Sequence, residues 1–115
     1  MSSNAHPVDF AGDWNVVSLG GDVVVAGSAP QLTFAVDGQF SGSGGVNRIM
    51  GTWRATEVSC SIGPVASTLM AGPDDVMDQE YRLLRLLEAV TNWLMDDPEL
   101  VLSGPGVVVR LIRCS

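Results

Sequence analysis

Apolar residues alternate with polar ones over most of the chain, with the period of two that is typical of β-strands. Residues 31–36 (QLTFAV) show this best, because Leu32, Phe34 and Val36 share one face of an extended chain. Asp37-Gly38 follows at once and favours a hairpin turn. By the same pattern and by their β-branched and aromatic content, we expect strands at residues 13–19, 22–27, 31–36, 39–44, 51–58, 92–95, 99–104 and 107–114.

A helical period is found between residues 73 and 90 (PDDVMDQEYRLLRLLEAV). Pro73 suits the first turn of a helix, and the acidic residues after it suit the positive N-terminal end. We expect this helix to pack on a sheet through Tyr81, Leu84 and Leu87. The sequence therefore predicts a mainly β (α+β) fold with an antiparallel sheet, in one domain of residues 10–115 after a flexible N-terminus at residues 1–9.

The charge of the chain limits the partners that it can bind. The 115 residues carry a formal net charge of −7, and the six basic residues are all arginines scattered along the chain. An acidic surface repels phosphate groups, so we expect neither nucleic acid nor anionic lipid as a partner. A monomer is expected.

The N-terminus predicts no export signal. It lacks a basic segment followed by about 7–15 apolar residues, and no stretch approaches the roughly 20 apolar residues of a membrane span. We therefore expect a cytoplasmic protein. Residues 3–5 (SNA) also resemble a cloning scar, which leaves open whether a leader was removed.

The segment at residues 40–53 (FSGSGGVNRIMGTW) contains four glycines. It could be a loop that binds a ligand or a turn between two strands. A phosphate-binding loop requires a lysine, and the chain has none. A dinucleotide fingerprint requires a third glycine before a helix, whereas this segment has Asn47 there and leads into a strand. We therefore interpret Gly42 and Gly44 as a bulge or close approach within a strand, and residues 45–51 as a turn.

Other reactive residues give weak signals. His6 is the only histidine, which leaves no arrangement for nucleophilic catalysis. Asp96, Asp97 and Glu99 fit a plain turn better than a calcium site. Cys60 and Cys114 could pair, coordinate or pack, with packing as the default, and the three tryptophans fit a core better than a ligand cage. We predict no catalytic, cofactor-binding or metal-binding residue.

Two segments together resemble the META/HslJ domain family. Residues 30–53 (PQLTFAVDGQFSGSGGVNRIMGTW) are similar to its pattern of a strand, an Asp-Gly turn and a Gly-x-x-Gly-Cys-Asn-x-x-x-Gly motif, and residues 65–87 (VASTLMAGPDDVMDQEYRLLRLL) are similar to its later Thr-x-Met motif and helix. The matching positions are Phe34, Asp37, Gly38, Gly42, Gly45, Asn47, Gly51, Ala66, Thr68, Met70, Ala71 and Leu87. The likeness covers about residues 10–113.

This resemblance implies a lipocalin-like open barrel of about seven or eight antiparallel strands with one helix packed on it. Members include bacterial stress-associated envelope lipoproteins and a protozoan virulence-linked protein, and the family has no established catalytic residues. Many members carry two cysteines at the positions that Val46 and Gly72 occupy here. If those cysteines form a bridge, Val46 and Gly72 are neighbours in space.

The resulting functional hypothesis is a non-enzymatic, stress-related binding or interaction module with a protein or peptide partner. A carrier of a small apolar ligand inside the barrel is the alternative, and a hydrolase that uses the acidic turn is less favoured. Gly42, Gly45, Asn47 and Gly51 are assigned to a structural turn rather than to a reaction. We expect Asn47→Ala to lower the free energy of unfolding by roughly 1–2 kcal/mol.

Overall fold

The computed structural model describes residues 10–114, so that His6 and the predicted flexible N-terminus lie outside the described residues. These residues form one helix, α1 (Asp74–Leu87), and ten strands. The strands are β1 (Gly12–Leu19), β2 (Asp22–Val23), β3 (Gln31–Phe34), β4 (Gln39–Ser43), β5 (Arg48–Ala55), β6 (Cys60–Ile62), β7 (Ala66–Ser67), β8 (Asn92–Asp96), β9 (Glu99–Gly104) and β10 (Val107–Arg113).

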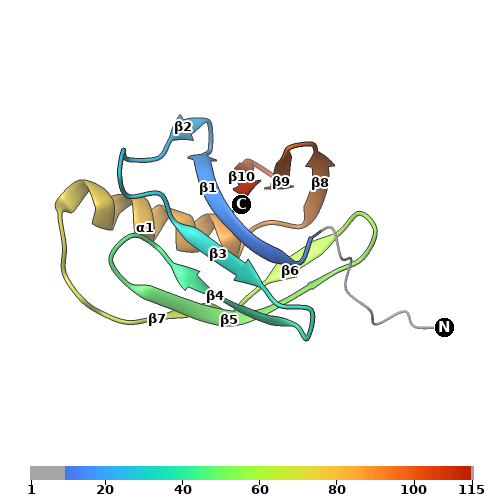
Figure 1. Ribbon diagram of the computed structural model, residues 1–115, viewed down its shortest axis with the longest axis horizontal. Helices are drawn as coiled ribbons and strands as arrows, with labels where there is room; N and C mark the ends of the chain where they lie inside the picture. Colours follow the sequence, from blue (N-terminus) through green and yellow to red (C-terminus); the bar gives the residue numbers. More distant parts are fainter. Residues whose placement is uncertain (1–9, 115) are drawn as a thin grey trace.

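The strands form a nearly closed antiparallel barrel (Figure 1). Its strands follow the order β6-β5-β4-β3-β1-β10-β9-β8, with β2 beside β1 and β7 beside β5. The barrel closes between its first and last strands, because the Cys60 N–H donates to the Thr91 carbonyl at 3.0 Å and Ser59 bridges Asn92. The predicted mainly β barrel with one packed helix is confirmed.

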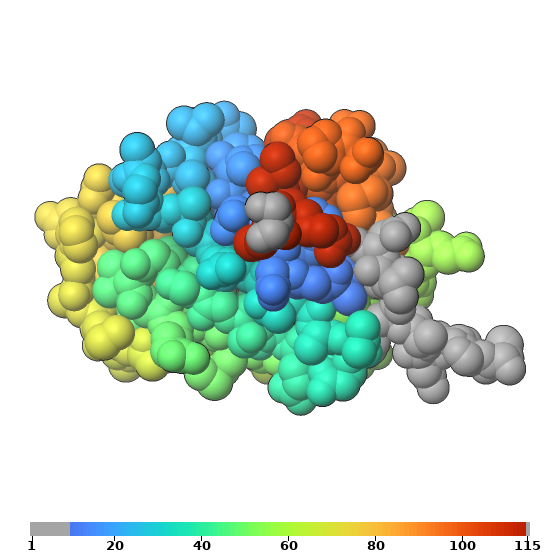
Figure 2. All heavy atoms as spheres, viewed as in Figure 1, coloured from blue at the N-terminus to red at the C-terminus, as the bar shows by residue number. Residues whose placement is uncertain are grey.

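Large aromatic side chains fill the barrel interior. Phe10 stacks on Trp53 with ring centroids 4.8 Å apart, and Phe34 meets Phe40 at 5.3 Å. Trp14 is also buried, with an exposed fraction of 1%. The space-filling view shows the C-terminal strands, in orange and red, beside the blue first strand (Figure 2), as the pairing of β1 with β10 requires.

The helix buries a face that differs from the predicted one. Leu83 and Leu87 are fully buried against the barrel, whereas Tyr81 is 65% exposed and Leu84 is only half-buried. The prediction is confirmed for Leu87 and wrong for Tyr81, because α1 is turned so that Tyr81 lies at the open groove and not against the barrel. The buried row instead follows Val76, Glu80, Leu83 and Leu87, at helical spacings of four, three and four.

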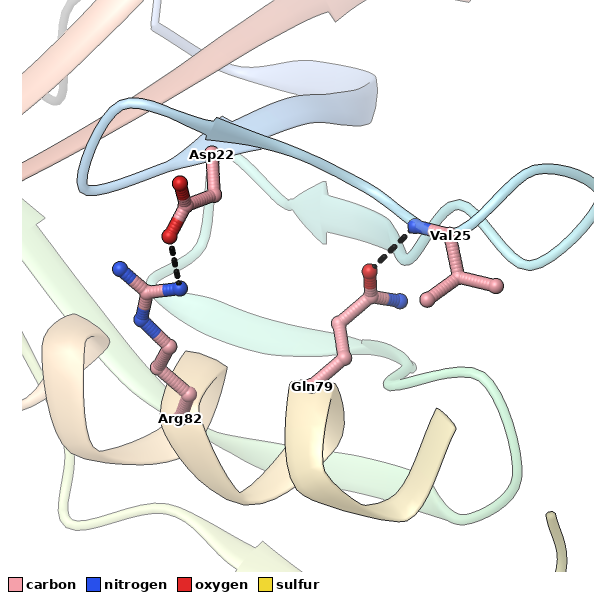
Figure 3. A network of polar contacts seen from close by, with 4 residues as sticks. All are labelled: Asp22, Val25, Gln79 and Arg82. Carbon is pink, nitrogen blue, oxygen red and sulfur yellow. Dashed lines mark hydrogen bonds and ion pairs between the residues drawn. The ribbon is translucent and has the colours of Figure 1, made fainter. Parts of the chain in front are cut away.

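The loop after β2 is attached to the other side of this helix. The Gln79 Oε1 accepts a hydrogen bond from the Val25 N–H at 2.6 Å, and its Nε2 donates to the Ser28 carbonyl at 2.9 Å. Arg82 pairs with Asp22 at 2.8 Å (Figure 3). These contacts fix a loop that was predicted as a strand over residues 22–27, although β2 ends at Val23.

The glycine-rich turn is shorter than predicted. It runs from Gly44 to Asn47, because β4 ends at Ser43 and β5 begins at Arg48. Gly44, predicted within a strand, therefore lies in the turn, and Gly51 lies inside a strand opposite Phe40. Gly42 also lies in a strand, where a Cβ atom would overlap the carbonyl oxygen of Gln31. At Gly51 a Cβ atom would lie 2.5 Å from the Pro64 carbonyl oxygen. Gly42 therefore allows β3 to approach β4 closely, and Gly51 allows the segment between β6 and β7 to approach β5.

Candidate functional site

The side chain of Asn47 lies in the turn between β4 and β5 and contacts two other segments of the chain. It is 3% exposed. Its Nδ2 donates to the Met70 carbonyl at 3.1 Å and to Glu80 Oε2 at 2.6 Å. Its Oδ1 accepts hydrogen bonds from the Met70 N–H at 2.6 Å and from the Thr68 hydroxyl at 2.8 Å. One amide therefore joins the turn, the segment after β7, and α1.

Glu80 is the partner that sequence reasoning missed. Its Oε1 accepts hydrogen bonds from the main-chain N–H groups of Val46 at 3.0 Å and Asn47 at 2.7 Å, and the residue is only 4% exposed. Burial raises the pKa of Glu80, but the hydrogen bonds from Asn47 and Val46 outweigh it and hold the pKa below its ordinary value. The signal that could have revealed Glu80 in the sequence is a carboxylate that shares a helical row with apolar residues.

Two glycines of the turn allow α1 to come this close. A Cβ atom at Gly44 would lie 2.5 Å from the Glu80 Cγ, and one at Gly45 would lie 2.7 Å from a methyl group of Val76. Gly45 also has a φ of +123°, which side-chain-bearing residues rarely adopt. The glycines of this turn thus bring its main-chain N–H groups within hydrogen-bonding distance of the helix.

Val46 and Gly72 lie against each other at the entry to α1. A Cβ atom built on Gly72 would lie 3.5 Å from the Val46 Cβ. That separation is at the short end of the range of about 3.5–4.5 Å found in disulfides. Val46 and Gly72 are therefore neighbours in space, as the resemblance implied.

An open groove runs above the Asn47–Glu80 cluster, between the segment that follows β7 and helix α1. It has a volume of about 380 Å³ and is mostly apolar. Leu69 on one wall is 94% exposed, Met70 is 54% exposed, and Tyr81 on the opposite wall is 65% exposed. The lining residues are Asn47, Ser67, Thr68, Leu69, Met70, Ala71, Met77, Glu80, Tyr81 and Leu84.

The family model of the META domain matches residues 8–114, nearly the whole chain. This chain belongs to the META domain family. The comparison with curated proteins gave no significant match.

Two solved structures resemble this META domain in fold. An NMR structure of a protein from Burkholderia xenovorans has a TM-score of 0.74 at 22% sequence identity, over 90% of this chain and 82% of that one. A crystal structure of a DUF4847 family protein from Bacteroides vulgatus has a TM-score of 0.68 at 18% identity, over 93% of this chain and 95% of that one. At these identities the likeness shows the fold alone.

The two cysteines and the acidic turn of this META domain make contacts within the fold. Cys60 is buried, its thiol lies 3.4 Å from the Asn92 carbonyl, and burial raises its pKa to about 12. Cys114 accepts a hydrogen bond from Gln31 at 3.6 Å, and neither cysteine is in a disulfide. In the acidic turn, Glu99 pairs with Arg110 at 3.0 Å.

Within residues 10–114, no three His, Cys, Asp or Glu side chains come together as a metal site would require. The single helix there is too short and too polar to cross a membrane.

Proposed function

We propose that this META domain is a non-catalytic binding module that holds an apolar peptide segment of a partner protein in the groove between the β7–α1 segment and the helix. The observation that carries the proposal is the apolar exposure of both walls, by Leu69 and Met70 on one side and Tyr81 on the other. Large apolar side chains that are exposed together mark interaction sites more often than isolated ones do.

The groove combines this apolar surface with a fixed floor. Its volume of about 380 Å³ falls within the range of roughly 300–1,000 Å³ that is usual for ligand sites. Asn47 and Glu80 hold the floor through buried hydrogen bonds. A surface that is ordered before binding loses less conformational entropy when a partner arrives, which favours affinity.

The two other hypotheses have less support. A carrier of apolar ligands needs space inside the barrel, where Phe10, Phe34 and Trp53 are in ring-to-ring contact. A hydrolase that uses the acidic turn needs a free carboxylate there as its acid or base, and Glu99 of that turn is engaged in an ion pair with Arg110 at 3.0 Å. The stress-related role that the resemblance implied stays a prediction.

A displayed peptide library selected against the full chain tests this function. We expect selected peptides to be rich in apolar residues and to lose binding when Leu69→Ser or Tyr81→Ser is introduced. Leu94→Ser is the matched control, because Leu94 is 62% exposed but lies on β8, outside the groove. Peptides that bind all three variants as well as the parent protein, or a selection that enriches no peptide, would overturn the proposal.

A further inference from the structure

The main chain of residues 66–71 is paired on one side only. On the side of β5, the Thr68 N–H donates to the Arg48 carbonyl at 3.0 Å. The Asn47 side chain then continues this pairing, since its amide bonds both the N–H and the carbonyl of Met70. The even-numbered residues therefore direct their main-chain groups toward β5.

The odd-numbered residues direct theirs the other way, because main-chain groups alternate along an extended strand. Val65 shows that this side faces α1, since the Val65 N–H donates to the side chain of Glu88, at the C-terminal end of α1, at 2.9 Å. Ser67 faces Ile49 in the register of β5 and β7, one position from the bonded Arg48–Thr68 pair. Within residues 10–114, no hydrogen bond uses the main chain of Leu69 or Ala71. An open main-chain edge, formed by Ser67 of β7 and by residues 68–71 that follow it, thus borders the groove.

We infer that the partner peptide binds as an added β-strand on this edge, pairing with the main chain of Ser67, Leu69 and Ala71. This inference rests on the proposed function and names the form of its ligand. Exposed strand edges accept extended peptides through main-chain hydrogen bonds, while alternate side chains provide specificity. The expected peptide is apolar at every second position, because those side chains share the face that meets Met77, Tyr81 and Leu84.

The charges around the groove add a requirement for the peptide. Glu80 is the only charged residue that lines the groove, and Arg85 lies beside it, with its guanidinium 5.6 Å from the centre of the Tyr81 ring. Asp74 is exposed in the first turn of α1, three residues beyond Ala71, whereas Asp75 lies on the side of the helix that faces β2. Because the whole chain has a net charge of −7, a peptide with basic residues near its end at Asp74 is complementary.

Amide hydrogen exchange tests whether the peptide binds as an added strand. It is measured by NMR on the 15N-labelled full chain, with and without a peptide selected from the library. In the free protein, the Leu69 and Ala71 amides are expected to exchange rapidly, whereas the Thr68 and Met70 amides are protected and serve as internal controls. Adding a selected peptide is expected to slow exchange at Leu69 and Ala71 by at least about tenfold, since tenfold corresponds to about 1.4 kcal/mol, near the value of one hydrogen bond. Unchanged exchange at both amides in a saturated complex would overturn strand addition while leaving groove binding intact.

N-methylation of the peptide gives a second test. Methylating alternate amides is expected to weaken binding about tenfold at the positions that pair with the edge, and little at those between them. A comparable loss at every interior amide would assign a bound helix, whose N–H groups all donate within the helix, and would overturn the inference. Ala71→Pro, which removes one edge N–H, is expected to weaken binding, whereas Ala71→Ser retains it. Self-association of the chain that Leu69→Ser abolishes would assign the edge to a second copy instead.

Discussion

At the scale of single residues, Asn47 is the most connected polar side chain of the turn. Its amide satisfies the N–H and the carbonyl of Met70 and donates to Glu80. Asn47→Ala leaves these groups without their partner, and we now expect a loss of about 3 kcal/mol in the free energy of unfolding, since each orphaned buried group costs roughly 1–3 kcal/mol. Urea denaturation measures it. Asn92→Ala, at an exposed site, is the control, and an equal loss in both variants would contradict this role.

Glu80 makes stability depend on pH in a defined direction. Its pKa is lower in the folded chain than the ordinary 4.5, so the unfolded chain takes up the proton first as the pH falls. The stabilisation is therefore complete above about pH 4.5 and is lost as the pH falls through the lower folded pKa.

Glu80→Gln tests this dependence. The new amide nitrogen faces the Asn47 Nδ2, donor against donor, and we expect a loss of about 2 kcal/mol at pH 7. The difference from the parent protein is expected to shrink below pH 4.5, as measured by denaturant unfolding at several pH values. Glu57→Gln, at an exposed position, is expected to show no such trend. A difference for Glu80→Gln that stays constant with pH would contradict the assignment.

The two members of this cluster differ in how far the sequence could reveal them. Asn47 stands in a turn and belongs to a motif, so it could be singled out from the sequence. Glu80 lies 33 residues away from it, and only the packing of α1 on the turn brings the two together. A helical wheel places Glu80 between Val76 and Leu83, but it cannot tell which donors a buried carboxylate meets.

At the scale of elements, the buried face of α1 can be tested directly. Leu83 is fully buried and Tyr81 is largely exposed. We expect Leu83→Ala to cost about 2–5 kcal/mol, the range for a truncated core leucine, and Tyr81→Ala less than about 0.5 kcal/mol. Leu84→Ala is expected to fall between them because Leu84 is half-buried at the groove. Thermal unfolding of the three variants checks this order. The reverse order would show that α1 buries the face with Tyr81, as the sequence predicted, and not the face with Leu83.

The contact between the β4–β5 turn and the entry to α1 can be made covalent. Gly72 does not have a positive φ, so a side chain is compatible with its backbone. In Gly72→Cys alone, the new Cβ would lie 2.6 Å from a methyl group of Val46, and Val46→Cys removes that methyl group. The double variant is therefore expected to be better tolerated than the Gly72→Cys variant.

We expect the double variant Val46→Cys, Gly72→Cys to oxidise spontaneously. The bridge would close a loop of about 25 residues and stabilise the fold by roughly 3 kcal/mol. Thiol titration counts the free cysteines, and melting with and without reductant measures the gain. Cys60 and Cys114, which are free in the parent protein, provide the reference count. Four free thiols after oxidation would show that the two positions are not aligned.

At the scale of the whole molecule, the sequence predicted the strands better than their closure. Alternation and turn residues place the chain in an antiparallel sheet. The seam between β6 and β8 depends on main-chain bonds such as that from Cys60 to Thr91, which carry no side-chain signature. The same holds for β7, which has only two residues and whose outer edge borders the groove. The pattern of side chains therefore could not show which main-chain segments pair at the seam and at β7.

The net charge of −7 leads to a prediction about binding of selected peptides. A basic peptide on the groove is attracted by the exposed carboxylate of Asp74, and salt screens such a pair, with a Debye length that falls from about 10 Å at 0.1 M to about 3 Å at 1 M. One exposed pair contributes about 0.5 kcal/mol, so the Kd is expected to rise about twofold across this range. Calorimetric titrations at several salt concentrations measure the Kd.

The same peptide with its basic residues changed to glutamine is the control. It is expected to bind more weakly but with little dependence on salt, because its apolar and main-chain contacts carry no charge. A basic peptide whose Kd stays constant with salt would contradict the electrostatic part of this model.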